Sequence, residues 1–323
     1  MKRIGIMTSG GDSPGMNAAT RSIVRKAIFE GLEVRGILRG YEGLINDEII
    51  EMNSRSVSNI LSRGGTILKT ARSKEFMTKD GQKKAVDVIK KNKLDAIVIN
   101  GGNGSLQGAI TLEKDWRVKT LGLPGTIDND LGHTDYTIGS HTSVDTVLDA
   151  VDKIRDTVSS MERVYIIEVM GRKEPYIAVM AGLAGGAEEI LVPGMELDIE
   201  QISSDIVSAK KKGKRSWIII VSEGFSSAQL LAKRIENKTE YEVRSITLGH
   251  VQRGGAPNAP DRILASRMGA YAVDALLGGH SGKMVGIKGD KLHLVSYEKA
   301  CFDRMKDKEL NKELYALTKL LAS

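Results

Sequence analysis

The chain has 323 residues, of which 41% are hydrophobic and 4% aromatic, and its net charge is +6. This length suits one large or two medium α/β lobes with aliphatic cores, and the modest positive charge suits small anionic ligands. A single cysteine, Cys301, excludes an intrachain disulfide and fits a reducing compartment. No stretch of the sequence has the character of a signal peptide or a membrane span, and no basic cluster is interleaved with aromatic residues. We therefore expect a soluble, intracellular protein with no membrane or nucleic-acid partner.

Strand, glycine-rich turn and helix recur through the first 130 residues. The predicted elements are a strand at 3–7, a helix at 18–30, strands at 33–38 and 96–100, and helices at 86–91 and 106–114. In the helix at 18–30, Ile23, Val24 and Ala27 form an apolar stripe with the helical period. This alternation predicts a doubly wound parallel sheet.

The next predicted strand is a short apolar run at 118–124 that breaks at a Pro-Gly pair. Thr126, Asp128 and Asp130 follow in the turn. In open α/β sheets, ligands bind outside the carboxyl ends of the strands. One carboxylate there could accept a proton while the other holds a hydrated metal. The alternative is a polar turn whose Asp and Asn residues bond to their own backbone.

A second set of elements follows from about residue 140. It comprises a helix at 143–156 and strands at 164–170, 217–222 and 246–248, and it extends to about residue 250. A helix at 261–277 and a polar, helical end follow. The fold class that we predict is α/β, with two Rossmann-like, three-layer α/β/α lobes. Their sheets are expected to be mostly parallel, with the active site in the cleft between the lobes.

Two glycine-rich loops, 10–15 and 101–105, each lie between a predicted strand and a predicted helix. Unpaired backbone N–H groups at a helix N-terminus stabilise an anion, so the two loops favour phosphate binding. Neither loop has the P-loop spacing or the Gly-x-Gly-x-x-Gly spacing. The alternative is that the glycines only satisfy tight turns.

Arginines stand at further strand ends and loops, and guanidinium groups bind phosphate with paired donors. Taken singly, each arginine is better explained as a surface charge, and His250 could be a buried imidazole with satisfied hydrogen bonds. Together with Asp128 and Glu223 they favour a site for a phosphorylated, hydroxylated substrate. The arginines are Arg72, Arg163, Arg172, Arg244 and Arg253.

Six motifs, in this order, resemble those of the bacterial ATP-dependent 6-phosphofructokinase family. They occupy residues 8–17, 63–66, 101–105, 124–130, 170–172 and 248–255, which spread over nearly the whole chain. The resemblance implies transfer of the ATP γ-phosphoryl group to the 1-hydroxyl of fructose 6-phosphate, the committed step of glycolysis. It also implies Mg²⁺ as cofactor and a cytoplasmic homotetramer with active sites and effector sites at subunit interfaces.

The same resemblance implies which ligand each lobe binds. Residues 1–139 plus about 252–304 would bind ATP, and residues about 140–251 plus 305–323 would bind the sugar phosphate. The implied ATP-binding residues are Gly11, Arg72, Ser73, Gly102, Asn103, Gly104, Ser105 and Gly108. Relatives that use pyrophosphate carry bulkier charged residues at the positions of Gly104 and Gly125, so these two glycines indicate ATP.

Catalytic roles also follow from the resemblance. Asp128 would take the sugar hydroxyl proton, Thr126 would orient the phosphoryl group, Arg172 would stabilise its charge, and Gly11 belongs to the same set. Arg163 and Arg244 are expected from a neighbouring subunit. The implied substrate-binding residues are Thr126, Ile127, Asp128, Arg163, Met170, Gly171, Arg172, Glu223, Arg244, His250 and Arg253.

The sequence departs from the family pattern at the expected metal site. Asn103 stands where the family has an aspartate that helps to hold Mg²⁺, and hard cations prefer carboxylates. We expect Asn103 and Asp130 as the candidate metal ligands. Ser73 and Met77 stand where the family has basic and aromatic or cysteine residues around the nucleotide. Pro175-Tyr176 replaces the Gly-Asp pair that the family usually has shortly after Met-Gly-Arg.

The implied effector site, for ADP or phosphoenolpyruvate, is mixed. Its matching residues are Arg21, Arg25, Arg155, Glu188, Lys212 and Lys214. Ser54, Asn59 and Ser216 replace an arginine, an aspartate and a histidine, so we expect altered or weakened allosteric control.

An active ATP-dependent 6-phosphofructokinase is the leading hypothesis, because Asp128, Thr126, Arg172 and the 6-phosphate set are intact. Asn103 motivates an alternative, a catalytically weakened paralogue that binds sugar phosphate or nucleotide in a regulatory role. A third reading is a kinase that prefers tagatose 6-phosphate, which has the same 6-phosphate group.

Overall fold

The computed structural model describes residues 1–161, 163–303 and 307–322. Its elements divide into two units, each with its own sheet and core. Unit 1 comprises Met1–Thr142 and Arg253–Lys306, and unit 2 comprises Ser143–Gln252 and Asp307–Ser323. Which ligand each unit binds stays a prediction.

Unit 1 is built on a seven-stranded sheet in the order β11-β10-β5-β4-β1-β2-β3. The strands are β1 (Arg3–Ser9), β2 (Glu33–Ile37), β3 (Ile49–Met52), β4 (Ala96–Gly101), β5 (Thr120–Pro124), β10 (Lys283–Lys288) and β11 (Lys291–Ser296). The inner strands pair in parallel, and only the edge strands β3 and β11 pair antiparallel. From β1 the chain builds toward β3 on one side and through β4 toward β5 on the other. The carboxyl ends of β1 and β4 therefore flank the topological switch point, where ligands bind in open α/β sheets.

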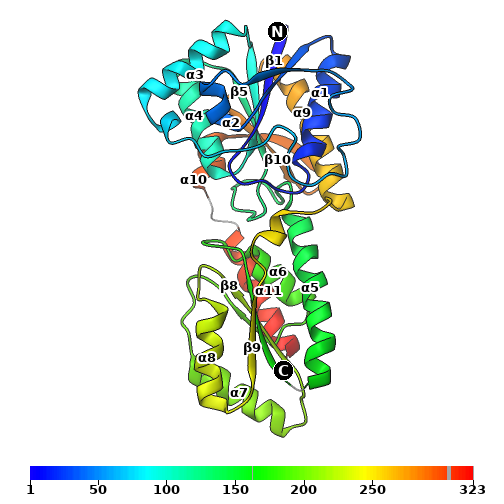
Figure 1. Cartoon of the computed structure of the whole chain (residues 1–323), viewed down its shortest axis with the longest axis vertical. Coiled ribbons are helices and arrows are strands. Elements are labelled where there is room, and N and C mark those ends of the chain that lie inside the picture. Colours follow the sequence, from blue (N-terminus) through cyan, green and yellow to red (C-terminus); the bar gives the residue numbers. More distant parts are fainter. Residues whose placement is uncertain (162, 304–306, 323) are drawn as a thin grey trace. The chain divides into compact units, whose positions relative to one another are not determined.

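Helices cover both faces of this sheet (Figure 1). In β4, Ala96 and Val98 face α1 and α9, whereas Ile97 and Ile99 face α2, α3 and α4, as the two-residue period of a strand requires. All four side chains are fully buried, so β4 is fixed from both sides. The helices of unit 1 are α1 (Met16–Phe29), α2 (Gly40–Ile45), α3 (Lys79–Lys91), α4 (Asn103–Trp116), α9 (Ala259–Leu277) and α10 (Tyr297–Phe302), with a 3₁₀ turn η1 (Glu75–Met77).

Unit 2 has a four-stranded, all-parallel sheet in the order β7-β8-β6-β9. Its strands are β6 (Val164–Val169), β7 (Glu189–Leu191), β8 (Trp217–Ser222) and β9 (Val243–Thr247), and its helices are α6 (Tyr176–Ala184), α7 (Ile199–Lys211), α8 (Ala228–Thr239) and α11 (Asp307–Ala322). α7 and α8 cover one face, and α6 and α11 pack on the other side of the sheet (Figure 1). α5 (Ser140–Met161) leads the chain into this unit and η2 (Gly249–Arg253) leads it out.

The predicted α/β class with two mostly parallel sheets is confirmed. α5 and α3 are longer than the predicted helices at 143–156 and 86–91, and the strands β3, β7, β10 and β11 were not predicted. No helix among the described residues is long and apolar enough to cross a membrane.

Candidate active site

The first glycine-rich loop joins β1 to α1. Gly10 and Gly15 have φ angles of 87° and 103°, in the left-handed region that favours glycine. Thr70 Oγ1 donates a 2.6 Å hydrogen bond to the Gly10 carbonyl and so fixes the loop. α1 begins after Gly15 with no side-chain cap. Its N-terminus is thus suited to an anionic ligand, because the first N–H groups of a helix have no acceptor within it.

The second loop joins β4 to α4, which also begins without a side-chain cap, at Gly102. Ser105 Oγ donates to Ser9 Oγ at 3.0 Å, and Tyr41 Oη donates to the Ser105 carbonyl at 2.7 Å. A Cβ added to Gly108 would lie 2.6 Å from the Tyr41 ring. Ser105 and Gly108 therefore have packing partners within the chain, and Ser105 links the two loops.

The turn after β5 carries the predicted catalytic residues. Thr126 Oγ1 accepts a 3.2 Å hydrogen bond from the Asp128 N–H, and Thr137 Oγ1 donates to the Thr126 carbonyl at 2.6 Å. Thr126 and Ile127 are buried, whereas Asp128 and Asp130 are partly exposed. Thr126 thus caps the local backbone, and Asn129 Nδ2 donates to the Asp135 carbonyl at 3.1 Å, so part of the turn bonds to its own backbone. Ile127, an expected substrate contact, could reach a ligand only through its backbone.

This turn packs directly against the second loop. A Cβ added to Gly102 would lie 3.4 Å from Thr126 Cβ, and one added to Gly125 would lie 2.2 Å from Asn100 Oδ1. By contrast, no heavy atom lies within 4 Å of a Cβ added to Gly104. The structure thus brings together the glycine loops and the carboxylate turn at the carboxyl ends of β1, β4 and β5.

Arg253 lies at the first loop. A Cβ on Gly11 would be 2.2 Å from Arg253 Nη1, which donates to the Asp12 carbonyl at 3.3 Å. The sequence analysis placed Arg253 with His250 at the sugar 6-phosphate. In the structure its guanidinium meets the loop expected to bind ATP, and His250 is exposed in η2.

In unit 2, residues 170–172 follow β6 and Glu223 follows its parallel neighbour β8. Ser222 Oγ donates to the Gly171 carbonyl. Arg172 Nε lies 3.5 Å from Glu223 Oε1, and the Arg172 side chain is 78% exposed. Four predicted substrate contacts therefore meet at one edge of this sheet, with a cationic group that is available to a ligand.

Arg163 and Arg244 lie elsewhere. Arg163 precedes β6, Arg244 is the second residue of β9, and both form ion pairs with Glu242. They are at the amino ends of the strands, whereas residues 170–172 follow the carboxyl end of β6. One chain does not bring the two groups together.

The effector residues fall into two sets. In unit 2, Arg155 Nη2 donates to the Gly186 carbonyl at 2.8 Å, and Lys214 Nζ lies 3.3 Å from the buried Glu188 carboxylate. Lys212 caps the C-terminus of α7. Arg21 and Arg25 lie one turn apart on α1 of unit 1.

The remaining nucleotide residues precede η1. Arg72 is exposed, and Ser73 Oγ accepts a 3.2 Å hydrogen bond from the Phe76 N–H. No group of three or more His, Cys, Asp or Glu side chains within the described residues could hold a metal by itself. Mg²⁺ bound with a nucleotide needs only one or two carboxylates besides phosphates and water, so the partly exposed Asp130 carboxylate fits such a metal.

Two residues that the sequence analysis missed support these loops. Gln252, fully buried, accepts from the Met170 N–H at 3.2 Å and donates to the Gly249 carbonyl at 3.0 Å. Asp261, also fully buried, accepts from the Gly139 N–H at 2.9 Å. A glutamine within the 248–255 motif and an aspartate in the first turn of a helix are the only signals that could have indicated them.

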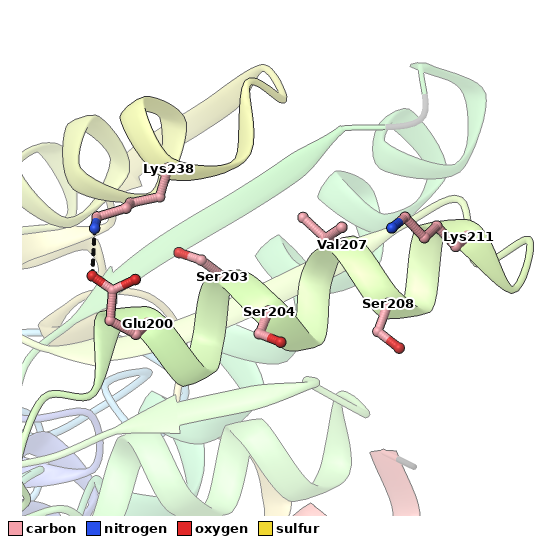
Figure 2. Close-up of a pocket in the computed structure, with 7 residues that line it drawn as sticks. All are labelled: Glu200, Ser203, Ser204, Val207, Ser208, Lys211 and Lys238. Carbon is pink, nitrogen blue, oxygen red and sulfur yellow. Dashed lines mark hydrogen bonds and ion pairs between the residues drawn. The ribbon is translucent and has the colours of Figure 1, made fainter.

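A shallow groove lies between α7 and α8 in unit 2 (Figure 2). Lys238 forms an ion pair with Glu200 at its edge. The lining residues are Glu200, Ser203, Ser204, Val207, Ser208, Lys211 and Lys238, none of which was predicted as a site residue.

The sequence matches the family model described as phosphofructokinase over residues 3–276. The chain belongs to the phosphofructokinase family. It is 50% identical to the ATP-dependent 6-phosphofructokinase of Thermoanaerobacter sp. (strain X514), over all of both chains. It is 49% identical to the enzyme of that name from Clostridioides difficile (strain 630), again over the full length of both. Among solved structures, Saccharomyces cerevisiae phosphofructokinase aligns with a TM-score of 0.87 and 32% identity. This phosphofructokinase chain is wholly covered by that alignment, which spans 48% of the yeast chain.

Proposed function

We propose that this phosphofructokinase transfers the γ-phosphoryl group of ATP to the 1-hydroxyl of fructose 6-phosphate, in glycolysis. The observation that carries the proposal is the contact between two uncapped glycine loops and the turn that bears Asp128, all at the switch point of one sheet. Membership of the family, with relatives named ATP-dependent 6-phosphofructokinase over the full length, supports the reaction and the donor.

ATP is the proposed ligand of unit 1. Backbone N–H groups at the start of α1 and α4 would hold its phosphates, and Gly104 leaves open space beside them. Arg253, placed against Gly11, would add a cation at the same loop. The full proposed set is Gly11, Arg72, Ser73, Gly102, Gly104, Ser105 and Gly108.

The proposed chemistry is an in-line displacement. The sugar O1 forms a bond to the γ-phosphorus, the bond from that phosphorus to the ADP oxygen breaks, and Asp128 accepts the O1 proton. Thr126 orients the transferred group, and Arg172 offsets its charge. Mg²⁺, when bound, neutralises charge on the phosphate oxygens, with Asp130 as the proposed carboxylate.

The sugar phosphate is assigned to Met170, Gly171, Arg172, Glu223 and His250, and to Arg163 and Arg244 of a neighbouring subunit. The proposal includes a cytoplasmic homotetramer. It also includes an effector site for ADP or phosphoenolpyruvate at Arg21, Arg25, Arg155, Glu188, Lys212 and Lys214.

The test measures ADP formation with and without fructose 6-phosphate at saturating Mg²⁺. We expect turnover that requires the sugar and falls about 10²- to 10⁴-fold in Asp128→Asn, because a general base contributes about that much. ADP affinity, measured by calorimetry, is expected to stay unchanged. Asp149→Asn, which alters an exposed carboxylate paired with Lys153 on α5, is the matched control.

Three outcomes would contradict the proposal. If Asp128→Asn turned over as fast as the native chain, Asp128 would not be the general base. A higher kcat/KM for tagatose 6-phosphate than for fructose 6-phosphate would make tagatose 6-phosphate the preferred acceptor. A folded protein that binds both ligands without turnover would indicate a regulatory role.

A further inference from the structure

Asn103 is the first residue of α4 and lies in the second glycine-rich loop. Both polar groups of its side chain have hydrogen-bond partners. Its Nδ2 donates to the main-chain carbonyl of Cys301 at 3.1 Å. Its Oδ1 accepts a hydrogen bond from Gln107 Nε2, one turn along the same helix. The amide is therefore committed to contacts within the chain.

The Cys301 contact joins segments that are far apart in the sequence. Cys301 is 1% exposed and belongs to α10, which packs against α4. Its Sγ lies 3.9 Å from the Asn103 carbonyl oxygen. The side chain of each of the two residues therefore contacts the main chain of the other. Lys114 and Glu298 form a 2.6 Å ion pair farther along the same two helices. We call Asn103, Gln107 and Cys301 the loop clamp.

The clamp requires an amide. An asparagine can donate to the Cys301 carbonyl and accept from Gln107 at once, whereas an ionised aspartate only accepts. A carboxylate placed there would face a carbonyl oxygen, with no hydrogen bond to offset the loss of water. The amide is a poor ligand for a hard cation, and in this arrangement its oxygen already has a donor.

We propose that Asn103 is a positioning residue of the nucleotide loop and not a ligand of the metal. It ties the start of α4 to α10 and so fixes the backbone of Gly102 and Gly104, which the proposed function, on which this inference rests, assigns to the ATP phosphates. The contribution of Asn103 to nucleotide binding is accordingly the same with and without Mg²⁺. Replacement of Asn103 by aspartate weakens the loop and does not create a better metal site.

The test compares ADP affinity by calorimetry in excess EDTA and in saturating Mg²⁺, for the native chain, Asn103→Asp and Gln107→Leu. We expect Asn103→Asp to weaken ADP binding about 5- to 50-fold, by the same factor in both conditions, as the loss of one or two hydrogen bonds predicts. Gln107→Leu removes the other half of the clamp and is expected to weaken binding less, again independently of Mg²⁺. Asn46→Asp, which removes a 3.0 Å donation to the Glu42 carbonyl at the end of α2, is the matched control and should not change ADP affinity.

A second measurement tests whether the loop clamp restrains residues 101–105 when no ligand is bound. Amide hydrogen exchange of residues 101–105 is expected to be faster in Asn103→Asp than in the native chain, and unchanged in Asn46→Asp. The inference is overturned if Asn103→Asp tightens ADP binding in Mg²⁺ alone, or if exchange of the loop does not change. If exchange behaves as expected but the native chain does not bind ADP, the loop clamp stands as a structural device and the proposed function fails.

Discussion

Gly125 and Gly104 are glycines for different reasons. A Cβ at Gly125 would meet Asn100 Oδ1 at 2.2 Å and Met16 Cε at 3.0 Å, whereas nothing lies near one at Gly104. Asn100 is fully buried in β4 and has little room to turn away. The turn that carries Asp128 is thus held by tight packing at Gly125, while Gly104 borders open space.

We predict that Gly125→Ala lowers stability by about 1–3 kcal/mol through overpacking, and lowers kcat about 10²-fold by displacing the adjacent turn. Asn100→Ala in the same chain should restore part of both, because it removes the atom that the new Cβ meets. Thermal unfolding and steady-state kinetics of the two single variants and the double variant measure the coupling.

Gly104→Ala is the control for stability in this experiment, and its Tm should be unchanged or slightly raised because alanine favours a helix. If the effects of Gly125→Ala and Asn100→Ala were additive, the contact between the new Cβ and Asn100 would not be the reason that residue 125 is a glycine.

At this scale the sequence predicted residue types better than residue partners. The motifs placed Thr126, Asp128 and Gly102 correctly at neighbouring strand ends, because parallel strands deliver their carboxyl ends to one edge. The partners of Asn103 and Arg253 could not be predicted, since Cys301 and Asp12 come from segments that only the tertiary fold brings near.

At the scale of elements, Asp261 joins α9 to the segment that follows the turn with Asp128. It accepts from the Gly139 N–H at 2.9 Å and from the Thr142 N–H at 2.7 Å. Gly125 in turn forms an isolated parallel bridge with Ile138. Burial raises the pKa of the Asp261 carboxyl, and the hydrogen bonds from Thr142 and Gly139 only partly oppose this.

We predict that Asp261→Asn lowers the free energy of unfolding by about 1–3 kcal/mol at pH 7, because the amide keeps one acceptor oxygen and turns an NH₂ group toward the N–H of either Gly139 or Thr142. With its pKa raised in the folded chain, Asp261 binds a proton in a pH range where the unfolded chain has lost it. The stability advantage of the native chain over Asp261→Asn therefore grows as pH falls toward about 4, the ordinary range of Asp.

Thermal unfolding of both proteins across this range measures the difference, and pH effects from other groups cancel in the comparison. An advantage that shrinks as pH falls would contradict the raised pKa.

Prediction of elements succeeded where a segment is buried on both faces. β4 and β8 are continuous apolar runs, which is the signature of a central parallel strand. β10 has a lysine at each end and a glycine among its four buried residues, β11 begins with a lysine, and β3 has two exposed residues, so the apolar run in each of these strands is short.

For the whole molecule, the proposed effector residues are shared between the two units. Arg155, Glu188 and Lys214 meet around residues 185–188, and Lys214 Nζ also lies 5.0 Å from the centre of the Trp217 ring. Arg21 and Arg25 are on α1. The proposed homotetramer, with effector sites at subunit interfaces, therefore has to be tested on the assembled protein.

We predict a sedimentation mass of four times 35.1 kDa. ADP or phosphoenolpyruvate should shift the saturation curve for fructose 6-phosphate, and Lys214→Met should reduce that shift several-fold because it removes a cation from the proposed anion site. Lys211→Met, a loss of the same charge in the groove of Figure 2, is the control and should leave the shift intact. A native chain that responds to neither compound would indicate that Ser54, Asn59 and Ser216 have abolished the control.

The order of the strands has a consequence for synthesis on the ribosome. β10 adds to β5 and α9 packs against α1, so the sheet with the nucleotide loops is incomplete until residue 288 has been made. Unit 2 in turn waits for α11, whose Lys319 pairs with the buried Glu189 beside β8. Neither unit can finish folding while its early part leaves the exit tunnel, so the nascent chain carries an unfinished sheet in unit 1 until β10 is made, and unit 2 lacks its last helix until the end of synthesis. An open edge at β5 is a surface that a chaperone would have to shield during that interval.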